Sequence, residues 1–212
     1  VDHTLLSQNS TWEEIKTICD DGIKYETASV CIPASYVKQA KEYVNEKLSI
    51  CTVIGFPNGY STTATKVFET ADAVKNGADE IDMVINVAKA KEHDYKYIEE
   101  EIRLVVGAAG GHTVKVILET CYLSEDEKVA CTLAAARAKA NFVKTSTGFG
   151  TGGTLVTDVV TMKANITPDM EVKASGGIKT LEDALTMIKV GATRIGTSGG
   201  PKLFSGSEVT GY

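Results

Sequence analysis

The sequence lacks the features of several large functional classes. No apolar run approaches the roughly 20 residues that cross a bilayer, so we expect no membrane partner. No basic segment followed by an apolar one opens the chain, which favours a cytoplasmic location. The formal net charge is -6, with 22 Lys and Arg against 28 Asp and Glu, and this acidity argues against a nucleic acid as the main partner.

Histidine and cysteine are too sparse or too scattered to indicate a metal site. The three histidines, His3, His93 and His112, lie far apart and show no ligand spacing. The five cysteines are odd in number, form no CxxC pair and stand within apolar segments. We therefore expect buried, reduced thiols and no metal.

What the sequence contains is a regular alternation of strands and helices. Strand-like segments recur at intervals of roughly twenty to thirty-five residues, and they are mainly apolar without a clean alternation, as parallel strands covered by helices are. Capping boxes at residues 10–13 and 124–127, and a cap at Thr180, mark helix starts. The predicted strands are residues 1–6, 27–32, 49–57, 80–86, 113–119, 142–149 (passing into a loop), 171–177 and 194–198.

This order predicts an α/β fold, a (β/α)8 TIM barrel. A faint repeat supports it, because residues 77–81 and 191–195 both lead from a helix stop into a strand. The alternative is an open doubly wound sheet, but no GxGxxG follows the first strand. We expect residues 1–212 to form a single barrel domain with a flexible tail from about residue 205.

The segment 142–149 places Lys144 in an apolar strand that ends in a glycine-rich loop. Burying an ammonium group costs several kcal/mol unless it is paired or neutralised. The segment 171–177 repeats the arrangement with Lys173. A solvated strand end would explain one such lysine, but two on neighbouring strands indicate a nucleophilic amine and the cation that activates it.

An acid in another strand completes the candidate site. Asp82 lies in the predicted strand 80–86, where its carboxylate could shuttle protons or pair with a lysine such as Lys115. Glu119 is a comparable acid with a weaker claim. Because the lysine-bearing strands lead into helix-preceding loops, these side chains should meet at the carboxyl end of the barrel.

Glycine-rich loops after the last two strands predict a phosphate site. Barrels commonly hold phosphate on these loops, where backbone N–H groups are available. The candidate residues are Gly176, Gly177, Gly196, Ser198 and Thr147. Lys179 could add charge, although a solvated surface lysine is an equal explanation. These residues together indicate imine formation with the carbonyl of a small phosphorylated substrate.

Eight collinear motifs from Asp2 to Ser198 resemble the deoxyribose-phosphate aldolase family. They are DHTLL, ASVCIP, CTVIGFP, NGADEIDMVIN, KVILET, FVKTSTGF, KASGGI and TRIGTS. The resemblance implies a cofactor-free, metal-free class I aldolase on a (β/α)8 barrel. Such an enzyme reversibly cleaves 2-deoxy-D-ribose 5-phosphate to D-glyceraldehyde 3-phosphate and acetaldehyde.

By the same resemblance Lys144 forms the Schiff base, Lys173 activates it, and Asp82 is the proton-relay acid. The phosphate region falls on the five residues named above. Three positions depart from the family pattern: Lys179 stands where arginine is frequent, Phe149 where some members have lysine, and Ala140 where glycine is usual. The first departure puts a bidentate phosphate contact in doubt.

Two other functions stay open at this point. One is a different imine-forming barrel enzyme, such as a transaldolase-like or dehydratase activity. The other is a catalytically silent sugar-phosphate-binding protein. The oligomeric state is also open, a homodimer included. The terminal Tyr212 is either part of a disordered tail or a phenol that enters the site and helps proton transfer.

Overall fold

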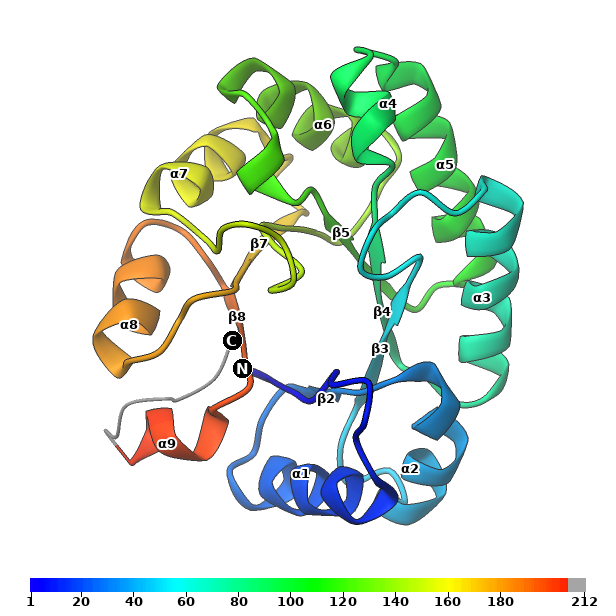
Figure 1. Ribbon diagram of the computed structural model, residues 1–212, viewed down its shortest axis with the longest axis vertical. Helices are drawn as coiled ribbons and strands as arrows, with labels where there is room; N and C mark the ends of the chain where they lie inside the picture. The colour runs from blue at the N-terminus through cyan, green and yellow to red at the C-terminus, as the bar shows by residue number, and fades with distance from the viewer. Residues whose placement is uncertain (206–212) are drawn as a thin grey trace.

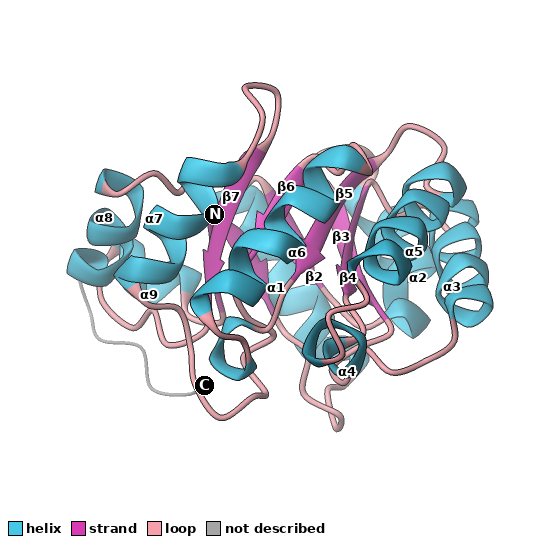
Figure 2. Cartoon of the chain, turned by 90° about the horizontal axis from the view of Figure 1, so that it is seen from above, coloured by secondary structure: helices cyan, strands magenta, loops and turns pink. Residues whose placement is uncertain are grey.

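A closed parallel barrel forms the centre of the protein. The computed structural model describes residues 1–205. The eight strands pair in sequence order, and β8 pairs back onto β1. Helices surround the barrel on all sides (Figures 1 and 2). The predicted (β/α)8 barrel is therefore confirmed, and the open sheet is excluded because the β1–β8 pairing closes the ring.

The strands are short, from three to five residues. They are β1 Asp2–Thr4, β2 Ser29–Cys31, β3 Ile50–Ile54, β4 Glu80–Val84, β5 Thr113–Ile117, β6 Phe142–Lys144, β7 Glu171–Ser175 and β8 Arg194–Thr197. Each lies inside the segment predicted for it, and the residues beyond its end belong to the loops that build the mouth of the barrel. Apolar composition alone does not show where a strand leaves the ladder of hydrogen bonds.

The helices lie where the apolar periodicity placed them, with some additions. They are α1 Trp12–Lys24, α2 Val37–Val44, α3 Thr63–Lys75, α4 Val87–Lys91, α5 Tyr95–Ala108, α6 Glu125–Arg137, α7 Val156–Asn165, α8 Leu181–Lys189 and α9 Gly200–Phe204. Two 3₁₀ turns, Ala34–Tyr36 and Thr120–Tyr122, precede α2 and α6. The short α4 was not predicted, because five residues carry too little periodicity to be recognised.

Two of the predicted helix caps are confirmed and one is wrong by a residue. The Ser124 hydroxyl accepts from the Glu127 N–H at 3.3 Å, and Thr180 caps α8 through Asp183 at 3.0 Å. At α1 the capping residue is Thr11, paired with Glu14, and not Ser10. The Ser10 N–H donates to the Ser7 carbonyl at 3.1 Å, so Ser10 belongs to the preceding turn.

The two faces of the barrel wall differ in polarity. Apolar side chains point outward and pack against the helices, among them Val116, Val143 and Val172, each with no exposed surface. Charged side chains lie on the inner face at alternate positions, such as Glu80 and Asp82 of β4. The outer face of the barrel is therefore packed against the helices, and the inner face carries buried charged side chains.

Two further expectations concern membrane-spanning helices and the C-terminal tail. No helix among residues 1–205 is both long and apolar enough to cross a bilayer. The expected flexible tail, including Tyr212, lies outside the described residues almost entirely.

Candidate active site

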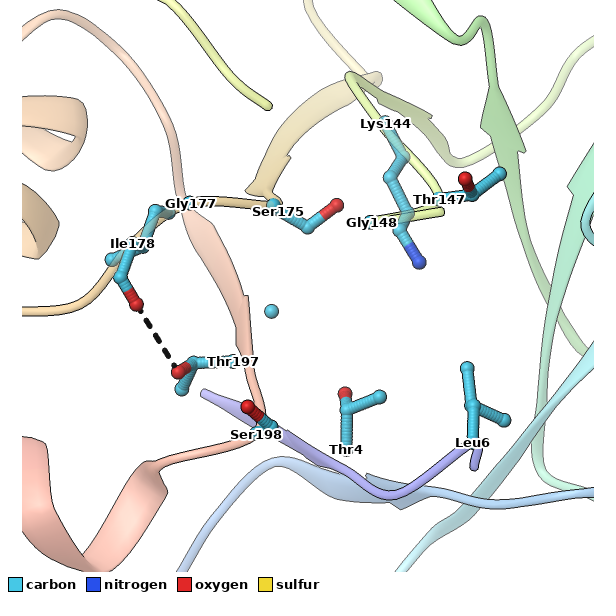
Figure 3. A pocket seen from close by; sticks show the side chains of 12 residues that line it. Thr4, Leu6, Lys144, Thr147, Gly148, Ser175, Gly177, Ile178, Thr197 and Ser198 are labelled. Atoms are coloured by element: carbon cyan, nitrogen blue, oxygen red, sulfur yellow. Dashed lines mark hydrogen bonds between the residues drawn. The ribbon is translucent and has the colours of Figure 1, made fainter. Parts of the chain in front are cut away.

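A hollow opens at the carboxyl end of the barrel, where the loops after β1, β6, β7 and β8 meet (Figure 3). Its lining residues are Thr4, Leu6, Lys144, Thr147, Gly148, Ser175, Gly176, Gly177, Ile178, Gly196, Thr197 and Ser198. The structure thus brings Lys144 together with all five residues predicted for phosphate binding. Asp82 and Lys173 lie beneath, inside the barrel.

Asp82 is the centre of the buried charges. Its Oδ2 accepts hydrogen bonds from Lys144 Nζ and from Lys173 Nζ, both at 2.8 Å. Its Oδ1 accepts from Lys115 Nζ at 2.7 Å. Asp82 therefore pairs with Lys115, as one reading of the sequence expected, and it also contacts the candidate nucleophile; its role as a proton shuttle stays a prediction.

Strand register explains why the lysines converge. Lys144 and Lys173 are partners across β6 and β7, so they lie at the same height with the same inward orientation. Asp82 and Lys115 are partners across β4 and β5 in the same way. The inward-facing lysines of β5, β6 and β7 therefore all reach the same carboxylate.

Lys173 is held as a cation. Burial would lower the pKa of its amine, but contacts to Asp2 Oδ2 at 2.5 Å and to Asp82 Oδ2 override that effect and raise the pKa. Lys115 is similar. Burial again opposes its charge, while Asp82 and Glu80, the latter at 2.6 Å, hold its pKa well above the ordinary lysine value.

Lys144 has a different environment from the other two lysines. Within residues 1–205 its carboxylate contact is Asp82 Oδ2, an oxygen that Lys173 also contacts. Figure 3 shows its amine pointing into the hollow. Among the described lining residues it is the one lysine. A substrate carbonyl in the hollow can therefore reach this amine, whereas Lys115 and Lys173 are fully buried.

Six charged side chains inside the barrel form a closed ring of alternating sign, which we call the charge ring. Its members in order are Asp82, Lys115, Glu80, Arg194, Asp2 and Lys173. Arg194 closes it, contacting Glu80 at 3.0 Å and Asp2 at 2.6 Å. Burial would raise the pKa of Asp82, but Lys115, Lys144 and Lys173 hold it well below the usual range. Asp82 is thus ionised at neutral pH.

The turn at Gly176 and Gly177, which we call the phosphate cradle, is shaped by close backbone packing. Gly176 and Gly177 have φ values of +83° and +77°, a left-handed conformation that favours glycine. The loop after β6 packs directly on this turn, because a Cβ at Gly153 would lie 2.4 Å from the Gly176 carbonyl oxygen. Turns of this kind present N–H groups to anions, and α8 begins just beyond.

Glu119 holds the loop that carries Thr147. The Thr147 N–H donates to Glu119 Oε1 at 3.0 Å, and its hydroxyl donates to Glu119 Oε2 in a short hydrogen bond. Thr147 Oγ1 in turn accepts from the Phe149 N–H at 3.0 Å. Thr147 therefore lines the hollow with its hydroxyl proton already directed to Glu119. Lys179 is exposed and is not among the lining residues.

Sequence reasoning missed three members of the charge ring: Asp2, Glu80 and Arg194. Glu80 precedes Asp82 by two residues, so the two acids share the inner face of β4, and this spacing was a usable signal. Asp2 and Arg194 stand 192 positions apart, and only barrel closure brings them together. No local pattern could have linked them.

One group of side chains has the composition of a metal site. Donor atoms of Cys31, Cys51 and Asp82 lie within 4.8 Å of one another, all buried. However, Lys115 already donates to Asp82 Oδ1, and it also lies 3.3 Å from the Cys51 sulfur. A cation here would have to displace an ammonium group, so these donors fit a metal poorly. The expectation of a metal-free site stays a prediction.

Comparisons with known proteins show which family this chain is similar to. The sequence profile of the DeoC/LacD family aldolases matches residues 1–206. A deoxyribose-phosphate aldolase of Streptococcus pyogenes is 58% identical over 198 residues, which cover 93% of this chain and 89% of the relative. One from Streptococcus agalactiae is 55% identical over 209 residues, covering 99% and 94%. The solved tetrameric deoxyribose phosphate aldolase of Aeropyrum pernix is 30% identical, with a TM-score of 0.86 and coverage of 96% and 87%.

Proposed function

Because the chain belongs to the DeoC/LacD family of aldolases, we propose that Lys144, Lys173 and Asp82 are the catalytic residues of its barrel. The reaction is the reversible cleavage of 2-deoxy-D-ribose 5-phosphate to D-glyceraldehyde 3-phosphate and acetaldehyde through a Schiff base. One observation carries the assignment of roles: Lys144 presents its amine to the hollow while sharing Asp82 Oδ2 with the cation of Lys173.

The first step is imine formation at Lys144. Its neutral amine attacks C1 of the open-chain aldehyde, and loss of water gives a protonated imine. Lys173, held as an ammonium by Asp2 and Asp82, disfavours a second positive charge on the neighbouring amine. Lys144 is thereby available as a nucleophile.

The second step breaks the bond between C2 and C3 of the sugar. A base takes the proton of the C3 hydroxyl, the bonding electrons of C2–C3 pass into the enamine, and D-glyceraldehyde 3-phosphate leaves. Protonation of the enamine carbon and hydrolysis of the imine then release acetaldehyde. We assign proton movement to Asp82 and Lys173, whose hydrogen bond connects the ionised carboxylate to an ammonium donor at 2.8 Å.

We propose that the loops at the edge of the hollow bind the phosphate group. We assign the phosphate to the turn of Gly176 and Gly177, to Gly196 and to Ser198, with Thr147 shaping the loop beside them. The lining of the hollow supports this, because it includes both the glycine turn and Lys144.

Further proposals concern the location, the assembly and the domain organisation of the protein. Reduced cysteines favour the cytoplasm, and all five are unpaired in the structure. The Aeropyrum pernix relative is a tetramer, which supports self-association, and a homodimer is the smallest such assembly we propose. We also propose that residues 1–212 form one barrel domain acting on a small phosphorylated sugar, with no metal or other cofactor.

The test compares two substrates in one assay. Acetaldehyde release is measured from 2-deoxy-D-ribose 5-phosphate and from unphosphorylated deoxyribose, for the wild type and for Ser198→Asp. We expect the added carboxylate to raise KM for the phosphorylated sugar by an order of magnitude or more, through repulsion of the dianion, and to leave unphosphorylated deoxyribose nearly unaffected. Equal effects on both would place the phosphate elsewhere. No acetaldehyde from either sugar with the wild type would refute the function.

A further inference from the structure

We propose that Glu80 and Arg194, which lie outside the hollow at the other end of the barrel, set the pH at which Lys144 becomes reactive. They act as positioning residues through their charges, with opposite sign. The inference rests on the proposed function, because it concerns the same amine. Neither residue lines the hollow, and their ion-pair partners are other members of the charge ring.

Two chains of contacts lead from this pair to the amine. On one side Glu80 Oε2 lies 2.6 Å from Lys115 Nζ, which lies 2.7 Å from Asp82 Oδ1. On the other, Arg194 lies 2.6 Å from Asp2 Oδ1, and Asp2 Oδ2 lies 2.5 Å from Lys173 Nζ. Lys173 and Lys144 then share Asp82 Oδ2. Both arms converge on the carboxylate that holds the nucleophile.

Charge balance gives the direction of the effect. The charge ring contains three carboxylates and three cations, so it is neutral by itself. Lys144 is attached to Asp82 from outside the ring, and its protonation leaves one uncompensated positive charge. A change in the net charge of the ring therefore changes the free-energy cost of that protonation.

Changing one ring charge should therefore move the titration of imine formation predictably. Removing the negative charge of Glu80 makes the ring positive, so Lys144 loses its proton more readily. Removing the positive charge of Arg194 makes the ring negative, so Lys144 keeps its proton to higher pH. We expect the loss of one such charge inside the barrel to move the pH midpoint of imine formation at Lys144 by about one unit.

Other ionisable groups lie around the site as well. The thiols of Cys31 on β2 and Cys51 on β3 lie beside Asp82, and Glu119 lies on the loop after β5. Burial raises the pKa of Cys51 well above the ordinary thiol value, whereas its hydrogen bond with Cys31 lowers the pKa of Cys31. These groups are unchanged in both variants. They cannot produce shifts of opposite sign.

The experiment follows imine formation with acetaldehyde as a function of pH. Cyanoborohydride reduces the imine to an N-ethyl amine, and peptide mass spectrometry quantifies the adduct on Lys144. The variants are Glu80→Gln, Arg194→Gln and the double variant. We expect the pH midpoint to move about one unit down for Glu80→Gln, about one unit up for Arg194→Gln, and back near the wild-type value in the double variant.

Two controls separate charge from structural damage. Arg194→Lys keeps the charge and should keep the wild-type midpoint. Glu101→Gln breaks the buried Lys66–Glu101 ion pair outside the barrel, at 2.8 Å, and should leave the midpoint unchanged. Shifts in the same direction, or no shift in either variant, would overturn the inference. If Arg194→Gln does not fold, the sign of the Glu80→Gln shift decides alone. Capture mainly on Lys173 and not on Lys144 in the wild type would instead refute the proposed assignment of the nucleophile.

Discussion

Lys144 and Lys173 are the same residue type on neighbouring strands, yet their surroundings assign them different tasks. Lys173 contacts Asp2 and Asp82 and is fully buried, so it is a fixed cation. Lys144 shares one oxygen of Asp82 and faces the hollow. The sequence could predict both lysines, since a charge in an apolar strand is costly without a purpose. The two strand patterns alone did not rank them; the family resemblance did, and the contacts of Asp2 show how their surroundings differ.

Replacing Lys173 tests the fixed-cation role. Lys173→Met removes one positive charge from the ring, so we expect the pH midpoint of imine formation at Lys144 to move up by about one unit or more, and turnover to fall by orders of magnitude. Lys179→Met is the matched control, because this neighbouring lysine is exposed and lies outside the hollow. If the pH midpoint of imine formation did not move in Lys173→Met, Lys173 would work by another route, such as proton donation alone.

At the scale of single elements, the loop after β6 and the loop after β7 act as one unit. The Thr154 N–H donates to the Gly176 carbonyl at 3.0 Å, and Gly153 packs against the same peptide. Glycine runs in the sequence predicted that these loops approach a ligand. That the two loops contact each other could not be predicted, because the contact depends on the spacing of β6 and β7 in the closed barrel.

Gly153→Ala tests this contact. The new methyl group would lie 2.4 Å from the Gly176 oxygen, so the cradle must shift. We expect KM for 2-deoxy-D-ribose 5-phosphate to rise by at least about tenfold, a loss of about 1.4 kcal/mol in binding, with little change for unphosphorylated deoxyribose. Gly107→Ala on α5 is the control, since a Cβ there meets nothing within 4 Å. An unchanged KM in Gly153→Ala would show that the loops move apart without consequence.

At the scale of the whole molecule, closure of the barrel creates the site. It joins Asp2 of the first strand to Arg194 of the last, and the charge ring exists only because this junction forms. The order of strands and helices was predictable from apolar segments and caps. The ring was not, since it depends on contacts between strands far apart in the sequence.

Buried charge outside the site should serve stability alone. Lys66 of α3 and Glu101 of α5 form a fully buried pair, and Lys66 also donates to the Val84 carbonyl at 2.8 Å. We expect Lys66→Met to lower the free energy of unfolding by about 3–5 kcal/mol, because Glu101 is left unpaired. The double variant Lys66→Met, Glu101→Leu should lose less than either single variant. Urea denaturation measures both, and additive losses would contradict this account.

The most direct test of the proposed chemistry is the site of covalent capture. The wild type is incubated with acetaldehyde and cyanoborohydride, digested and mapped by mass spectrometry. The arrangement of Lys144, Lys173 and Asp82 predicts an N-ethyl adduct on Lys144, its absence in Lys144→Met, and no adduct on Lys173 in either protein. Capture mainly on Lys173, or undiminished capture in Lys144→Met, would contradict the assignment of the nucleophile.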